Sequence, residues 1–182
     1  MTHGQAEPLV GEEPTQRVSL YVDTQNLYYA ARDQGGAVDF ATLLAVAVRG
    51  RRLSHATAYV VEREGDSTAF GFVGKLTSLG YRVKRRKVRV HRVADDGTPV
   101  MEGDWDMGIA ADIVRGLEHA DVVVLASGDG DFVPILELAQ ERGKRVEVMA
   151  FREVAGQALQ DMADRFVELG EVEGIFLQPR TP

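Results

Sequence analysis

The stretch DVVVLASGDGDF, residues 121–132, governs how the rest of the chain is interpreted. Its first half is an apolar run, which is typical of a strand buried on both faces of a parallel sheet. Its second half places Asp129 and Asp131 one residue apart, directly after that strand. Because Gly and Asp are common in turns, a strand-to-helix turn with a capping aspartate is enough to explain this stretch on its own. A functional interpretation requires partner residues elsewhere in the chain.

Short apolar strands alternate with helical patterns along the chain. The expected strands are residues 17–22, 54–62, 81–90, 121–126 and 145–151, and the expected helices are residues 24–34, 39–50, 67–80, 106–119, 131–143 and 155–166. This alternation predicts an α/β fold, with a mainly parallel sheet of about five strands covered by helices on both faces. We expect the strand order 3-2-1-4-5, which places the first strand beside residues 121–126. The domain is expected over residues 17–170, with a flexible tail at 1–16 and a C-terminal tail at 171–182.

Composition excludes several classes of protein. The 182 residues contain no cysteine, which removes disulfides, thiolate nucleophiles and Cys-based zinc sites, and suits a cytoplasmic location. No run of eighteen apolar residues predicts a membrane span, and the N-terminus lacks the pattern of a signal peptide. The net charge of −7 argues against a general polyanion binder.

Acidic side chains follow two strands that are expected to be neighbours. Asp23 ends the first strand, with Asn26 in the next helical turn, and Asp129 and Asp131 follow the fourth strand. Because adjacent strands lie about 4.8 Å apart, Asp23 and Asp129 should face one another across that gap. Carboxylates this close repel each other, and a divalent cation relieves the repulsion. Mg²⁺ and Mn²⁺ prefer such oxygen ligands.

A third segment, GDWDMGIAAD at residues 103–112, adds further carboxylates. Asp104 and Asp106 lie at the start of a helix, and Asp106 is expected to point from that helix end toward the strand ends. Asp112 lies six residues further along, a rotation of roughly 600°, so it cannot share one narrow face with Asp106. We therefore treat Asp112, together with Asp104 and Ser127, as a second-tier candidate for the metal site.

Each aspartate also has a purely structural explanation. Asp131 suits the N-cap of the helix that follows it, and Asp104 or Asp106 could cap the helix after Trp105. The convergence of three separate segments on one predicted edge favours a metal site, because helix caps have no reason to gather there. Trp105 is expected to pack under the helix start, although it could also stack on a base.

A basic strip, residues 82–92 (RVKRRKVRVHR), lies on an otherwise acidic chain. It holds seven Lys and Arg residues and no acid. Such a strand belongs at the edge of a sheet, where its charges prevent aggregation. Phosphate contacts from Lys and Arg also supply most non-specific affinity for nucleic acid. We expect the backbone of a nucleic acid to be held by Lys84, Arg85, Arg86, Lys87 and Arg89.

With these residues assembled, the chain resembles the NYN domain family, in its LabA-like branch, within the wider group of PIN-like nucleases. The resemblance covers roughly residues 17–170 and rests on VDTQNLYYAA (22–31), GDWDMGIAADIV (103–114), SGDGDFVPILELAQERGKRVEVMAF (127–151) and ALQDMADRFVEL (158–169). It implies a Rossmann-like, three-layer α/β/α PIN-like fold and a ribonuclease site that uses Mg²⁺ or Mn²⁺. By this analogy the metal ligands are Asp23, Asp106, Asp129 and Asp131, with Asn26 assisting.

The resulting hypothesis is a metal-dependent ribonuclease acting on single-stranded RNA, with Ser127 steadying Asp129 or a water. One alternative is a regulator that keeps the fold and binds RNA or a protein without catalysis. It is favoured by Glu102, which occupies a position that is commonly Lys in this branch. Another alternative is a metal-dependent phosphohydrolase of small nucleotides. GIFLQ at residues 174–178 could dock on the domain or on a second copy, so a homo-oligomer stays open.

Overall fold

The structure is a computed structural model that describes residues 13–63, 68–88, 90–93, 99–101 and 104–177. Its centre is a six-stranded sheet in the order β3-β2-β1-β6-β7-β8, in which every pairing is parallel. The strands are β1 (Arg17–Asp23), β2 (Arg52–Arg63), β3 (Arg82–Val88), β6 (Val122–Ala126), β7 (Arg145–Ala150) and β8 (Arg165–Glu168). The expected order of the first five strands is confirmed, and β8 extends the sheet by one strand.

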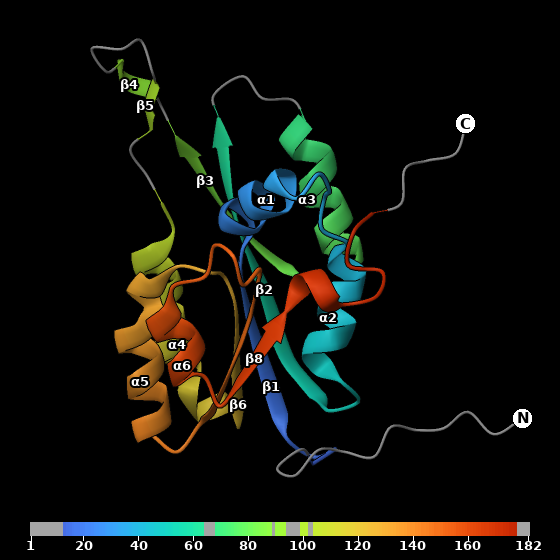
Figure 1. Cartoon of the computed structure of the whole chain (residues 1–182), viewed down its shortest axis with the longest axis vertical. Helices are drawn as coiled ribbons and strands as arrows, with labels where there is room; N and C mark the ends of the chain where they lie inside the picture. The colour runs from blue at the N-terminus through green and yellow to red at the C-terminus, as the bar shows by residue number, and fades with distance from the viewer. Residues whose placement is uncertain (1–12, 64–67, 89, 94–98, 102–103, 178–182) are drawn as a thin grey trace, which may run out of the picture.

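Helices cover both faces of this sheet (Figure 1). One face carries α1 (Thr24–Asp33), α2 (Phe40–Val48) and α3 (Thr68–Ser78), and the other carries α4 (Asp106–Gly116), α5 (Val133–Glu141) and α6 (Gln157–Met162). Short 3₁₀ turns are η1 (Leu117–His119), η2 (Gly130–Phe132) and η3 (Leu169–Glu171). The result is the three-layer α/β/α arrangement expected of a PIN-like fold.

Alternation along the strands builds two separate cores. Val122 and Val124 face the core under α1 and α2, whereas Val123 and Leu125 face the core under α4 and α5. All five residues of β6 are buried, as expected for a central strand with helices on both sides. No helix in the described ranges has the length and apolarity needed to cross a membrane.

The C-terminal part of the chain differs from the sequence prediction. The helix expected over 155–166 ends at Met162, and residues 165–168 form β8 beside β7. In β8, Phe166 packs against one core and Val167 against the other, which is the two-residue period of a strand. Beyond residue 171 the chain also packs on the domain, because Ile175 is 1% exposed and Phe176 stacks on Phe151.

The basic strip begins in β3, an edge strand as expected, but it is not one continuous strand. After Val88 the chain enters a separate antiparallel pair, β4 (Val90–Val93) with β5 (Pro99–Met101), which projects from the domain in Figure 1. Arg89 and Glu102 lie outside the described residues.

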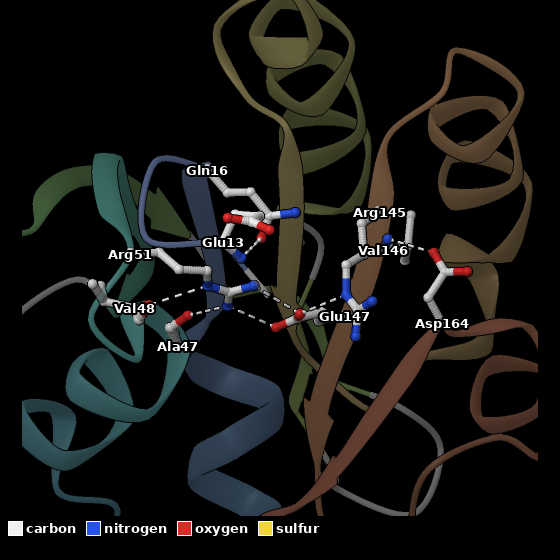
Figure 2. A network of polar contacts seen from close by, with 9 residues as sticks. All are labelled: Glu13, Gln16, Ala47, Val48, Arg51, Arg145, Val146, Glu147 and Asp164. Carbon is white, nitrogen blue, oxygen red and sulfur yellow. Dashed lines mark hydrogen bonds and ion pairs between the residues drawn. The ribbon is translucent and has the colours of Figure 1, made fainter. Parts of the chain in front are cut away.

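A buried ion-pair network closes the end of the sheet where the strands begin (Figure 2). Both guanidinium Nη atoms of Arg51 donate to the two carboxylate oxygens of Glu147 at 2.9 Å. Arg51 also donates to the carbonyl of Ala47 at 2.8 Å, and Arg145 donates to Glu147 at 3.0 Å. The side chains of Arg51 and Glu147 are 1% and 2% exposed. This network ties the end of α2 to β7.

Candidate functional site

The carboxyl ends of β1 and β6 bring Asp23 and Asp129 into one linked group. Val22 pairs with Ala126, so Asp23 and Ser127 are the next residues on the two neighbouring strands. The hydroxyl of Ser127 donates to Oδ2 of Asp23 at 3.3 Å, and the amide of Asp129 donates to Oγ of Ser127 at 3.2 Å. Ser127 therefore connects the Asp23 side chain to the backbone of Asp129.

Asn26 joins the same two segments from the side of the helix. Its backbone amide donates to Oδ1 of Asp23 at 3.1 Å, which makes Asp23 the N-cap of α1. Its side-chain Oδ1 accepts a hydrogen bond from the amide of Gly128 at 2.9 Å. A Cβ on Gly128 would lie only 3.2 Å from Cα of Ala155, so a larger residue there would require the Ala155 backbone to shift by a few tenths of an ångström.

Asp129, and not Asp131, accepts the capping hydrogen bond in this loop. Oδ1 of Asp129 accepts from the amide of Asp131 at 2.9 Å and caps η2. The helix α5 then begins at Val133, with Phe132 at the cap position and no side-chain cap. The structural explanation offered for Asp131, an N-cap, is therefore wrong. Asp131 is exposed.

The start of α4 delivers Asp106 to the same region. The indole of Trp105 donates to the carbonyl of Val60 at 3.1 Å, and its ring lies 5.4 Å from that of Tyr59. Trp105 therefore packs under the helix start, as expected. Asp106 and Asp131 line one hollow of about 490 Å³, which also includes Asp104.

The electrostatics of Asp106 show that these carboxylates lie close enough to act on one another. Burial, followed by the negative charges of Asp104, Asp129, Asp23 and Asp131, raises the pKa of Asp106 to about 6. Burial also raises the pKa of Asp23, although hydrogen bonds from Asn26 and Ser127 oppose the increase. We call Asp23, Asp106, Asp129 and Asp131 the acidic rim. Among the described residues, no Lys or Arg forms an ion pair with any of them.

Asp112 lies apart from the acidic rim. Its Oδ2 accepts hydrogen bonds from the hydroxyl of Tyr59 at 2.7 Å and from Nζ of Lys84 at 2.6 Å, and its Oδ1 accepts from Arg115 at 3.2 Å. Burial tends to raise the pKa of Asp112, but the hydrogen bonds from Lys84 and Tyr59 outweigh it and hold the pKa below its usual value. Asp112 is a packing and ion-pair residue that joins α4 to the sheet.

The donor atoms of the acidic rim suit a hard divalent cation, since all are carboxylate oxygens. The side chains as they stand do not form a ready coordination sphere. Across the described ranges, no three His, Asp or Glu side chains are grouped so that they could hold one metal ion. The chemistry and charge of the rim carboxylates thus fit a divalent cation, but their side chains are not arranged to ligate one.

Comparison with known proteins gives a consistent assignment. The NYN domain matches residues 17–170 of this chain. The low amplitude and bright protein LabA of Synechococcus elongatus is 24% identical over 168 residues, which are 91% of this chain and 90% of the relative. A protein of unknown function from Vibrio parahaemolyticus, solved as a crystal structure, superposes with a TM-score of 0.76 at 30% identity. The match covers 93% of this chain and 100% of that one.

This chain belongs to the NYN domain family. A shorter match, 32% identical over 74 residues, links it to an uncharacterized protein of Methanocaldococcus jannaschii and covers 40% of this chain and 31% of that relative. NYN domains are in general nuclease-like, with a PIN-like fold and divalent-metal chemistry. In this NYN domain the acidic rim occupies the ends of β1 and β6 and the start of α4.

The described cations of the basic strip divide between the two faces of β3 in this NYN domain. Arg86 lies over the ring of Trp105 at 4.5 Å and donates to the carbonyl of Asp104, on the same face as Lys84 with its partner Asp112. Arg85 pairs with the buried Glu62. Lys87 is exposed, and Arg89 falls outside the described residues. The expected RNA-holding residues therefore have different surroundings, and Lys84, Arg85 and Arg86 have structural partners.

Sequence reasoning gave Asn26 only an assisting role and did not identify its contact with Gly128. The signal was present, because an Asn three residues after a strand-ending Asp lies in the first helical turn beside the next strand. It also missed a cavity beside α1, whose lining combines residues of α1 and α3 with residues of β2 and the C-terminal segment.

Proposed function

We propose that this NYN domain is a divalent-cation-dependent ribonuclease that hydrolyses phosphodiesters of single-stranded RNA at the acidic rim. The observation that supports this most directly is the charge of the rim. Burial, followed by the charges of carboxylates from three separate segments, raises the pKa of Asp106 to about 6. No described cationic side chain forms an ion pair with the rim carboxylates. A bound cation would compensate this charge. The family is nuclease-like, which agrees with the proposal.

Asp23, Asp106, Asp129 and Asp131 are the proposed ligands of Mg²⁺ or Mn²⁺. A cation of this kind supplies an activated water and stabilises the charge that develops on a phosphodiester. The chain itself contributes orientation. Ser127 and the amide of Asn26 hold the two oxygens of Asp23, and the Asn26 side chain fixes the loop that carries Asp129.

A second candidate is a non-catalytic RNA-binding protein with the same fold. It is favoured by the lack of a group of three metal-holding side chains among the described residues. The two functions differ in one outcome, because only the ribonuclease needs Asp129 for product formation.

The test is cleavage of a single-stranded RNA with added Mn²⁺, comparing the wild type with Asp129→Asn. Asp161→Asn is the matched control, since Asp161 is an exposed acid of α6 that accepts a hydrogen bond from Gln157. We expect loss of cleavage in Asp129→Asn and wild-type cleavage in Asp161→Asn. Equal cleavage by all three proteins would refute the assignment of the acidic rim. RNA binding without cleavage by the wild type would favour the second candidate.

A further inference from the structure

A second concave site lies beside α1. It has a volume of about 660 Å³ and is lined by α1, α3, the start of α2 with the residues before it, the end of β2 and Leu177 of the C-terminal segment. Figure 1 shows α1 and α3 together on the same side of the sheet, with the C-terminal segment close by. Its volume lies within the usual range of about 300–1,000 Å³ for small-molecule sites.

This cavity is close to the acidic rim along the chain. Thr24 and Gln25, which line it, directly follow Asp23. Two residues of backbone span at most about 7 Å. One part of the cavity lining therefore lies close to Asp23.

Aromatic rings make up much of the cavity wall. Tyr28 and Tyr29 come from α1, with their ring centroids 5.3 Å apart, and the ring centroids of Phe40 and Phe72 lie 5.4 Å apart. Tyr28 is 60% exposed, although exposure of so large a ring gives up favourable burial. Aromatic faces of this kind stack on nucleobases of any sequence.

The charge of the lining points to an anionic ligand. Arg32 and Lys75 line the cavity, and none of its described lining residues is acidic, in a chain whose net charge is −7. Arg32 lies over the Tyr29 ring at 5.0 Å, and its ion pair with Asp33 at 3.3 Å is exposed. Exposed pairs of this kind contribute little, so the Arg32 guanidinium stays accessible to a phosphate.

We infer that this cavity binds a nucleobase of the RNA strand, stacked on Tyr28, with its phosphate near Arg32 and Lys75. The inference rests on the proposed function, because it places this base next to the phosphodiester at the acidic rim. It gives the protein a binding site for RNA that does not depend on the basic strip.

The test is the binding of a fluorescein-labelled single-stranded RNA of ten nucleotides, measured by anisotropy in EDTA so that cleavage does not interfere. Stacking on one aromatic residue is worth about 1–3 kcal/mol, so Tyr28→Ala should weaken binding by about fivefold or more. The matched control is Phe70→Ala. Phe70 is a 77% exposed aromatic of α3 that does not line the cavity, and its removal should leave the affinity unchanged.

Two further measurements separate the contribution of base stacking from that of phosphate contacts. An RNA of the same length without bases should bind wild type and Tyr28→Ala equally, and Lys75→Ala should reduce the salt dependence by about one phosphate contact, a slope change of about 0.7. Equal affinities of Tyr28→Ala and Phe70→Ala for the intact RNA would overturn the inference. So would absence of RNA binding by the wild type, or a change of oligomeric state in Tyr28→Ala that points to a second copy in the cavity.

Failure of the cavity assignment can be distinguished from failure of the proposed ribonuclease. If Asp129→Asn cleaves RNA like the wild type while Tyr28→Ala weakens binding, the ribonuclease proposal fails and the cavity assignment stands. If Asp129→Asn abolishes cleavage while Tyr28→Ala binds normally, the cavity assignment fails alone.

Discussion

Asn26 is the residue that fastens the two acidic segments to each other. Its side chain is the hydrogen-bond acceptor for the buried amide of Gly128, at 2.9 Å. In Asn26→Ala this amide loses its acceptor, and a buried unsatisfied donor costs about 1–3 kcal/mol. We expect the free energy of unfolding, measured in urea, to fall by that amount. The amide of Gly128 should also exchange its hydrogen faster.

The informative comparison is Asn26→Asp. A carboxylate oxygen can accept the same hydrogen bond from Gly128, so this variant should protect the Gly128 amide from exchange better than Asn26→Ala. Its added charge repels the rim carboxylates, so amide exchange and not overall stability is the readout. Equal exchange of the Gly128 amide in the two variants would show that the contact with Gly128 does not hold the loop.

The ion pair between Arg17 and Asp121 gives a pH-dependent prediction. Hydrogen bonds from the side chain and amide of Arg17 lower the pKa of Asp121 to about 2. Because this folded-state pKa is below the unfolded value, the stabilisation is fully present above about pH 4 and is lost as the pH falls toward 2. Asp121→Asn should therefore have a lower Tm than the wild type at pH 6. The gap should narrow between pH 4 and pH 2 in thermal melts followed by circular dichroism. A gap of constant size across this range would contradict the role of the charge.

For single residues, the sequence predicted their place in the fold better than it predicted their hydrogen-bond and ion-pair partners. Asp23 and Asp129 were placed at strand ends because apolar runs of fixed length precede them. The choice of Asp129 over Asp131 as the cap depends on the 3₁₀ turn at 130–132, which residue preferences for capping cannot distinguish from a direct helix start. The role of Asp112 is set by its ion pair with Lys84, which lies 28 positions earlier in the chain.

At the scale of elements, the buried pair of Arg51 and Glu147 holds α2 against β7. Removing one partner of a buried ion pair leaves an uncompensated charge, which costs about 3–5 kcal/mol. Glu147→Gln should lower the free energy of unfolding by about 3 kcal/mol in urea titrations. The exposed acid Glu137 of α5 offers the control Glu137→Gln, which should change stability little.

The double variant Arg51→Met/Glu147→Leu tests the same pair from the other direction. Replacing both charges with apolar side chains of similar volume is often neutral, so this protein should be more stable than Glu147→Gln. If the double variant is less stable than Glu147→Gln, the ion pair makes a net favourable contribution to folding stability and does not merely offset the cost of burying its two charges.

The strands β3 and β8 show what sequence patterns leave out at this scale. The density of charge in β3 correctly indicated an edge strand, but residues alternate between the two faces of a strand. Lys84 and Arg86 therefore meet α4 and Trp105, while Arg85 meets Glu62. In β8, four residues directly after a helical pattern read as more helix, and only pairing with β7 makes them a strand. Long-range pairing of this kind is not encoded in local periodicity.

At the scale of the whole molecule, the parallel sheet separates stability from the proposed chemistry. The Arg51 network closes the end where strands begin, and the acidic rim lies where they end. The alternation of strands and helices was sufficient to predict the layers, the strand order and this edge. It was not sufficient to predict the cavity beside α1, because that cavity is bounded by the C-terminal segment and α3, which meet only in the folded chain.

Cation binding should stabilise the whole fold, because a ligand that binds only the folded state raises its stability. At a concentration a hundred times the dissociation constant, the gain is about 2.7 kcal/mol. We expect Mn²⁺ to raise the Tm of the wild type in a saturable manner, and EDTA to reverse the increase. The physical reason is that a cation offsets both the burial of Asp106 and its repulsion by the other carboxylates, which together raise the pKa of Asp106. Asp129→Asn should lose most of this response, while Asp161→Asn should keep it, because Asp161 lies on α6 and not in the acidic rim. A Tm of the wild type that does not respond to Mn²⁺, or an equal response in Asp129→Asn, would show that the rim carboxylates do not share a cation.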